Sequence, residues 1–144
     1  MRMLIIHVDS FRSQNTQRGR SRVAEDAVCE SVEVGEALLV LACAEKDDEP
    51  DPSAVGRMAA AEAAKLARQL KVNTVVVHSF AHLFAELAQP EAALQVLREM
   101  ERALTSDGFS VARTPFGWFN TMELSAKGHP LSRVARTVRL SGGR

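Results

Sequence analysis

Cysteines, long apolar runs and a surplus of charge of either sign are scarce or absent in this sequence. Cys29 and Cys43 are its only cysteines. Both lie in apolar segments and form no C-x-x-C pair, so we expect buried thiols rather than a disulfide or a metal ligand. The apolar run at 37–44 is far shorter than a membrane span, and the run at 1–7 is too short for a signal peptide. We therefore expect a cytoplasmic protein that contacts no membrane.

The charge balance argues against a protein that grips a long nucleic acid by its phosphates. The chain has 18 basic residues (lysine plus arginine) and 18 acidic residues (aspartate plus glutamate), so its net charge is zero. Proteins that bind a long nucleic acid are usually basic. No glycine-rich loop follows any predicted strand, so a nucleotide cofactor finds no support either. With 144 residues, 46% of them hydrophobic and 25% charged, the chain has the composition of an ordinary globular domain.

The first part of the chain reads as strands around a polar stretch. Apolar and β-branched residues predict strands over 3–8, 24–34 and 37–44, the last two forming an antiparallel hairpin around Gly35-Glu36. The stretch 11–22 contains four arginines and no acidic residue. It is interpreted either as a solvated loop or as a contact for phosphates.

The second part predicts two helices and further strands. A helix over 52–70 follows from apolar residues at helical spacing, with Asp51 as its N-cap and Pro52 at its first position. Pro90 opens a second helix, which ends at Asp107-Gly108. Strands are expected over 74–78, 109–113, 118–125 and 134–140. This order predicts an α/β fold with a mixed sheet and two main helices.

Two familiar kinds of site are weakly suggested by the histidines. His78, His82 and Glu86 lie four apart, which on one helix would align three metal-type ligands. The residues before His78 are strand-like, however, so a metal site is not favoured. Ser79 and His82, with Asp9 as a third member, suggest a serine nucleophile, but nothing resembles G-x-S-x-G and this reading is not favoured either.

Several motifs in a fixed order carry more information than any of them alone. They are Leu4-Ile5-Ile6-His7-Val8-Asp9, Ser79-Phe80-Ala81-His82-Leu83, Pro115-Phe116-Gly117-Trp118-Phe119-Asn120 and Lys127-Gly128-His129-Pro130-Leu131. Together these segments resemble the N-terminal editing domain of archaeal threonyl-tRNA synthetase. The resemblance extends from Met1 to about Leu140, so we assign 1–140 to a tRNA editing domain and 141–144 to a linker or tail.

The resemblance implies a fold, an activity and a site. Members of this family share the fold of D-aminoacyl-tRNA deacylases, form homodimers and hydrolyse the ester of L-serine on threonine tRNA, without a metal or a nucleotide cofactor. The pocket is expected where the turn with F-A-H meets the loop with P-F-G. The residues implied at this site are Ala44, Phe80, Ala81, His82, Phe116, Gly117, Phe119 and Asn120, with Arg133 at the RNA end.

The chain departs from the family pattern at three of these positions. Asn120 stands where members often have lysine, Phe119 where they have tyrosine, and Arg133 where they have glutamate. An asparagine amide cannot act as a general base, so a lysine-centred mechanism does not transfer. We expect Asn120 to hold the water or the seryl group, and His82 either to transfer a proton or to be a hydrogen-bonded structural residue.

Hydrolysis without a side-chain base needs other groups. Backbone amides of the Phe116-Gly117 turn could stabilise the oxyanion, and the 2′-hydroxyl of the terminal ribose could position the water. Specificity would follow a double sieve, because loss of one methyl group weakens serine binding at a threonine site by only ~1–3 kcal/mol. A domain that touches only the tRNA tip needs no net positive charge if a synthetase body or partner chain holds the rest.

Two alternatives remain open from the sequence. The first is a free-standing deacylase for D-aminoacyl-tRNA on the same fold. The second is a catalytically silent module for RNA binding or dimerisation, which Asn120 and Arg133 make conceivable.

Overall fold

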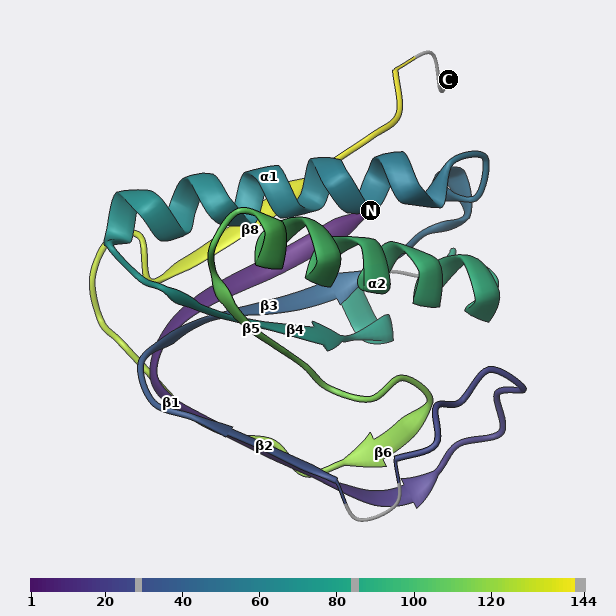
Figure 1. The fold of residues 1–144 in the computed structure, drawn as a ribbon, viewed down its shortest axis with the longest axis horizontal. Helices are drawn as coiled ribbons and strands as arrows, with labels where there is room; N and C mark the ends of the chain where they lie inside the picture. The colour runs from purple at the N-terminus through teal and green to yellow at the C-terminus, as the bar shows by residue number, and fades with distance from the viewer. Residues whose placement is uncertain (28–29, 84–85, 142–144) are drawn as a thin grey trace.

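The computed structural model describes residues 1–27, 30–83 and 86–141, and forms a mixed α/β domain with two main helices, as predicted (Figure 1). The elements in chain order are β1 (Arg2–Arg18), β2 (Ser31–Val34), β3 (Ala37–Cys43), the 3₁₀ turn η1 (Lys46–Asp48), α1 (Pro52–Leu70), β4 (Thr74–Ser79), the 3₁₀ turn η2 (Ala81–Leu83), α2 (Pro90–Ser106), β5 (Ser110–Arg113), β6 (Trp118–Asn120), β7 (Glu123–Ala126) and β8 (Arg133–Thr137). Of the predicted tail, 142–144 lie outside the described residues, as does Cys29.

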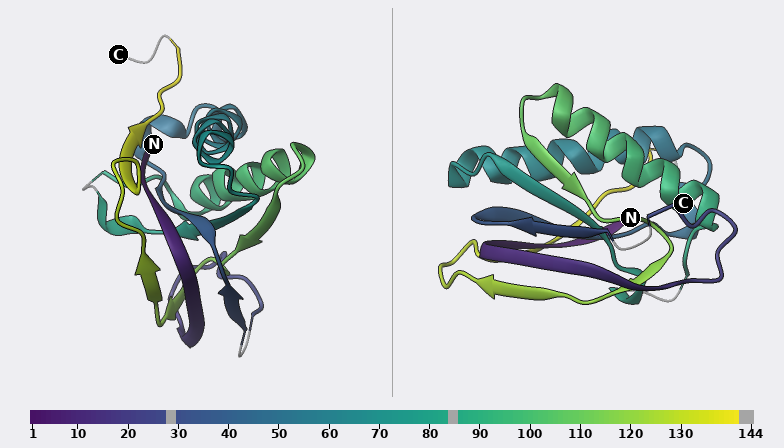
Figure 2. Two further views of the ribbon diagram at one scale, coloured as in Figure 1. Left: turned by 90° about the vertical axis from the view of Figure 1, so that its left-hand side faces the viewer. Right: turned by 60° about the horizontal axis from the view of Figure 1, so that its bottom comes forward.

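The sheet is mixed and curls around its first strand. β1, β3, β4 and β5 lie side by side in that order, with β3, β4 and β5 parallel to one another and β1 antiparallel to β3, and β2 pairs with the second half of β1 on the same edge as β3. Along its other edge, β1 pairs in turn with β8, β7 and β6. The first half of β1 lies under the helices, and its second half bends away with β2 and β6 (Figures 1 and 2).

Both helices lie on one face of the sheet and begin as the sequence predicts. The Asp51 side chain accepts a hydrogen bond from the Ala54 amide at 3.0 Å, with Pro52 in the first turn. Pro90 likewise stands at the first position of α2, whose N-cap residue Gln89 makes no capping hydrogen bond through its side chain. No helix in 1–27, 30–83 or 86–141 is long and apolar enough to cross a membrane.

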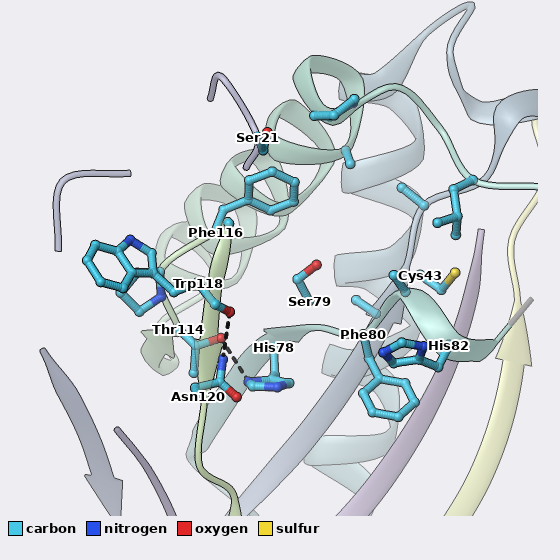
Figure 3. A pocket seen from close by; sticks show the side chains of 18 of the residues that line it. Ser21, Cys43, His78, Ser79, Phe80, His82, Thr114, Phe116, Trp118 and Asn120 are labelled. Carbon is cyan, nitrogen blue, oxygen red and sulfur yellow. Dashed lines mark hydrogen bonds between the residues drawn. The ribbon is translucent and has the colours of Figure 1, made fainter. Parts of the chain in front are cut away.

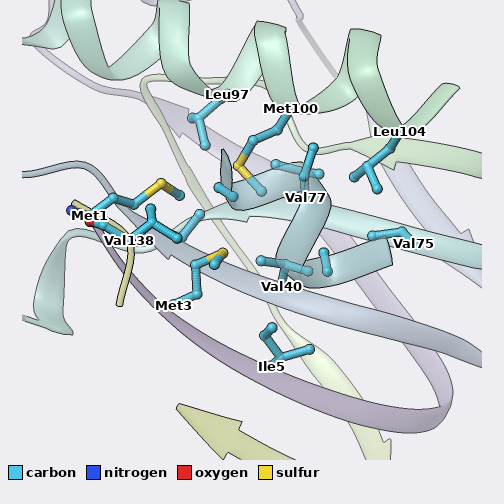
Figure 4. Close-up of a cluster of buried hydrophobic side chains, with 14 of the residues drawn as sticks. Met1, Met3, Ile5, Val40, Val75, Val77, Leu97, Met100, Leu104 and Val138 are labelled. Carbon is cyan, nitrogen blue, oxygen red and sulfur yellow. Dashed lines mark hydrogen bonds between the residues drawn. The ribbon is translucent and has the colours of Figure 1, made fainter. Parts of the chain in front are cut away.

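Two apolar layers hold these elements together, one on each face of the sheet. Residues such as Ile5, Val40 and Val77 point toward the helices and pack under Leu97 and Met100 of α2 (Figure 4). The alternate strand positions face the other way, because successive side chains of a strand point to opposite faces. That second layer contains Ile6, Val8, Phe11, Leu39, Leu41 and Val76. Cys43 is buried, as expected.

The prediction of a loop over 11–22 is wrong for 11–18, because β1 continues to Arg18, whereas 19–22 are not strand. Phe11 and Ser13 are buried while Arg12 and Gln14 are exposed, which is the alternation of a strand with one buried face. The strand is held at both edges, by β2 on one side and by β7 and β6 on the other. Its polar composition concealed this pattern in the sequence.

The predicted hairpin between 24–34 and 37–44 is also wrong. The strands β2 and β3 do not pair with each other but lie end to end along the same edge of β1, with Val34 opposite Phe11 and Ala37 opposite Val8. Gly35-Glu36 is therefore a bend between two strands that pair one after the other with β1. Residues 24–27 and 30 are not strand, and the predicted strand over 118–125 is interrupted at 121–122 to give β6 and β7.

Candidate active site

A cavity of about 480 Å³ lies beyond the carboxyl ends of the parallel strands β3, β4 and β5. Its walls come from 42–44, 78–82, the first turn of α2, the loop 114–117 and β6 (Figure 3). In open α/β sheets this edge is the usual place for a ligand, because the strands end there together and the following loops surround a shared space. The cavity volume is in the range of sites that hold drug-sized molecules.

The structure brings together eight of the nine predicted site residues. Those that line the cavity are Ala44, Phe80, Ala81, His82, Phe116, Gly117, Phe119 and Asn120. Arg133 is not among them. It lies on β8 opposite Ile6 of β1, four residues before Thr137. Thr137 lies opposite Arg2, near the cavity end of the sheet. At the usual rise of a strand, Arg133 lies about 13 Å farther along β8. The chemical roles of all nine remain predictions.

The lining of the cavity is largely apolar, with a few polar side chains. Among the described residues that form it, none is aspartate, glutamate, lysine or arginine, and the imidazoles are those of His78 and His82. Phe80, Phe116 and Trp118 are partly buried, and Phe119 is 64% exposed at the rim. The described lining residues therefore provide neither a carboxylate nor an amine that could take a proton from water in this cavity.

His82 lies in η2 and is exposed. Its ring meets that of Phe80 edge-on, with centroids 5.4 Å apart (Figure 3). No hydrogen bond joins it to the described part of the chain. The alternative of a hydrogen-bonded structural histidine therefore gains no support from this arrangement.

His78 is a site residue that sequence reasoning did not select. It is the penultimate residue of β4, is 4% exposed, and has Nδ1 2.9 Å from the hydroxyl oxygen of Thr114. Burial lowers the pKa of His78 to about 4, so its ring is neutral near pH 7 and is a weak proton acceptor. The pairing of β4 with β5 brings Thr114 to it from a distant part of the chain, which local spacing does not reveal.

We expect His78 to make the fold sensitive to acid. Its pKa is lower in the folded state than in the unfolded chain, so protons bind preferentially to the unfolded state as the pH falls. Stability should decrease between about pH 6.5 and 4, by up to roughly 3 kcal/mol. Urea unfolding at several pH values checks this. His78→Gln should flatten the dependence and the exposed-site control His82→Gln should retain it; identical slopes in both variants would refute the assignment.

The segment 19–27 lies directly against the P-F-G loop. The Gly19 amide donates to the Gly117 carbonyl at 2.7 Å, and the Glu25 amide donates to the Phe116 carbonyl at 3.0 Å. The indole N–H of Trp118 donates to the Glu25 carbonyl at 2.7 Å. These contacts fix the loop that forms one wall of the cavity.

Gly117 is required at the tightest point of this contact. Its φ is +86°, a conformation that residues with a side chain rarely adopt. A Cβ atom on Gly117 would lie 2.6 Å from both Cα and Cβ of Ala24. The backbone conformation and the contact with Ala24 thus require a glycine at this position of the P-F-G motif, independently of any substrate.

The structure corrects the expectation that both amides of the Phe116-Gly117 turn are available to an oxyanion. The Phe116 amide donates to Oε1 of Glu25 at 2.9 Å. The Gly117 amide has no hydrogen-bond partner among the described residues. Of the two, only the Gly117 amide is therefore a candidate donor to substrate.

The two disfavoured readings are not supported by the geometry. In the described ranges, no group of three or more histidine, cysteine, aspartate or glutamate side chains is placed to hold a metal ion. Asp9 pairs with Lys127 rather than with His82 or Ser79. A triad of Ser79, His82 and Asp9 is thus not assembled.

Comparison with known proteins agrees with the motifs that line the cavity. A model of the family described as the Archaea-specific editing domain of threonyl-tRNA synthetase matches residues 1–138. Threonine–tRNA ligases of Methanococcus maripaludis (strain C7), Methanopyrus kandleri and Methanocaldococcus jannaschii are 41%, 38% and 37% identical over 138 residues. These matches cover 96% of this chain and 22% of each relative, so the chain spans about a fifth of their length.

The fold and the cavity define an α/β domain with a candidate site at the carboxyl edge of its parallel strands. The chain belongs to the family of Archaea-specific editing domains of threonyl-tRNA synthetase. This confirms the resemblance seen in the sequence, and the role that follows for the chain is proofreading.

Proposed function

We propose that the chain hydrolyses the ester that joins L-serine to the 3′ end of threonine tRNA. The aminoacyl ribose would enter the cavity, with the seryl group toward Phe119 and Asn120 and the terminal adenosine near Ala44. The family membership supports the proofreading role. The motif residues that the resemblance assigns to the site also line one cavity of suitable size.

The reaction consumes one water molecule and needs no cofactor. Water oxygen adds to the ester carbonyl carbon, and the carbonyl oxygen becomes an oxyanion that accepts a hydrogen bond from the Gly117 amide. The bond between this carbon and the 3′ oxygen then breaks. The proton from water passes to the 3′ oxygen, so the products are free serine and a tRNA with its 3′-hydroxyl restored.

One observation carries the mechanism: the described lining residues include no carboxylate and no amine. His78 is neutral but weakly basic, and Asn120 cannot accept a proton as a base. We assign the positioning of the water and the relay of its proton to the 2′-hydroxyl beside the ester, and the exposed imidazole of His82 is the protein group that could share the proton transfer. Asn120, whose side-chain amide lies 3.4 Å from the Trp118 carbonyl, would hold the water or the seryl group.

Selectivity against threonine is proposed to come from shape. Threonine has one methyl group more than serine, and an editing cavity can exclude that methyl by contact. The rigid walls at Phe116 and Gly117, held by the segment 19–27, suit such a role because a wall that yields cannot exclude one methyl group.

The proposal includes partners. A synthetase body or a separate catalytic chain would hold most of the tRNA, in keeping with the zero net charge of this domain. We also propose a homodimer, since Phe119, Met122 and Leu124 are exposed along β6 and β7. Arg133 does not line the cavity of its own chain, and its contact with the RNA end stays a prediction. Phosphate contact by the arginines of 11–22 also stays a prediction.

The alternatives are separated by the stereochemistry of the substrate and by turnover. An L-seryl ester on threonine tRNA should be hydrolysed much faster than a D-aminoacyl ester on the same tRNA. The reverse preference would indicate a D-aminoacyl-tRNA deacylase. Tight binding of a seryl-adenosine analogue without turnover of either ester would indicate a silent binding module.

A further inference from the structure

We propose that Glu25 is a positioning residue of the hydrolytic site, acting through the Phe116-Gly117 turn. This inference rests on the proposed function, because it concerns how the same cavity is held ready for the ester. Glu25 does not line the cavity. It lies behind the turn, in the segment 19–27, and its importance is invisible in the motifs of the sequence.

Glu25 contacts the turn through its backbone amide, its backbone carbonyl and its side-chain carboxylate. Its amide donates to the Phe116 carbonyl at 3.0 Å, and its carboxylate accepts the Phe116 amide at 2.9 Å. Its carbonyl accepts the indole N–H of Trp118 at 2.7 Å. One residue therefore fixes both polar groups of the Phe116 backbone and the residue after Gly117.

Glu25 is itself held by charge. Arg113, at the end of β5, donates to both carboxylate oxygens of Glu25, at 2.6 and 2.9 Å. Bidentate pairs of this kind fix orientation as well as distance. The two side chains are 11% and 19% exposed, and the hydrogen bond from Arg113 is the main reason that the pKa of Glu25 is lowered to about 2. Arg98 lies 3.5 Å from the same carboxylate.

The arrangement leaves the two amides of the turn with different tasks. The Phe116 amide is taken by Glu25, so it anchors the wall, and the Gly117 amide remains for the oxyanion. Loss of the Glu25 carboxylate would release the Phe116 amide and let the turn move. A displacement of about 1 Å at a catalytic donor can lower the rate on the order of 10²-fold.

The chain offers a matched control in Glu101. Its carboxylate also accepts a hydrogen bond from Arg113, at 3.2 Å, but it contacts neither Phe116 nor Gly117. Glu25→Ala and Glu101→Ala therefore each remove one carboxylate from Arg113, and only the first frees the turn. We expect Glu25→Ala to lower kcat for the seryl ester about 10- to 100-fold with little change in KM. Glu101→Ala should stay within about twofold of the unmutated chain.

Amide hydrogen exchange at Phe116 provides a readout that does not depend on activity. Protection of this amide should be lost in Glu25→Ala and retained in Glu101→Ala. If Glu25→Ala does not fold, Glu25→Gln keeps the side-chain size while removing the charge that Arg113 requires. Equal kcat in the Glu25 and Glu101 variants would overturn the proposal, whether both are active or both are impaired.

Failure of the proposed function would be recognised separately. In that case the unmutated chain would not hydrolyse the seryl ester. The positioning role is then tested by binding of 3′-seryl-amino adenosine, an amide analogue of the ester end. Glu25→Ala should weaken this binding about tenfold relative to Glu101→Ala, and equal affinities would overturn the inference.

Discussion

Replacing the 2′-hydroxyl of the terminal adenosine by hydrogen should lower the rate of seryl-ester hydrolysis by about 10²–10³-fold, the loss typical of one group that stabilises a transition state. The reason is that the described residues lining the cavity provide no carboxylate or amine that could take over its task. The ester stays on the 3′ oxygen, so the reacting bond is unchanged. The measurement is single-turnover deacylation of seryl-tRNA with and without the 2′-hydroxyl.

Binding and a histidine variant complete this test. The 2′-deoxy substrate should bind with nearly normal affinity, because contacts to the base and the seryl group remain. His82→Ala should be milder than the 2′-deoxy change if His82 does not transfer the proton, and equally severe if it does. A normal rate with 2′-deoxy seryl-tRNA would mean that a protein base performs the step and that the mechanism is wrong.

Gly117→Ala should both destabilise the fold and strongly reduce hydrolysis. Alanine is strained at a φ of +86°, and its Cβ would lie 2.6 Å from backbone and side-chain carbon of Ala24. Backbone strain and overpacking each contribute about 1–3 kcal/mol, so a loss of roughly 2–6 kcal/mol in the free energy of unfolding is expected. The turn can relieve the contact only by moving, which displaces the Gly117 amide and should lower kcat about 10²-fold.

Gly35→Ala is the matched control for this substitution. A Cβ atom there would meet no heavy atom within 4 Å, and Gly35 has no positive φ. It should change stability and kcat little. Urea unfolding and deacylation kinetics at a temperature where both variants are folded separate the two effects. If Gly117→Ala and Gly35→Ala have the same stability and the same kcat, the close contact between the turn and 19–27 contributes to neither folding nor hydrolysis.

The sequence predicts the regular elements well where one residue pattern dominates. Asp51-Pro52 and Pro90 set the starts of both helices, and helical spacing gives the span of α1 to the residue. The parallel strands β3 and β4 are short and apolar, and their ends were placed to within one residue. Family motifs then indicated most of the residues that surround the cavity.

The remaining features depend on contacts between distant residues. The polar half of β1 is a strand only because β2, β6 and β7 pair with it, and composition alone predicts a loop there. Burial within the sheet lowers the pKa of His78 and keeps its ring neutral, and sheet pairing brings Thr114 to it from a distant part of the chain. Glu25 contacts Arg113 and Phe116, which are 88 and 91 positions away along the chain, so nothing in its sequence neighbourhood marks it.

The most direct test of the proofreading function compares two esters on one tRNA. Threonine tRNA charged with L-serine or with L-threonine is incubated with the chain, and kcat/KM for deacylation is measured for each. We expect the seryl ester to be hydrolysed at least about tenfold more efficiently, because the extra methyl group of threonine is excluded from the cavity. Equal hydrolysis of the two esters, or no hydrolysis of seryl-tRNA, would contradict the account.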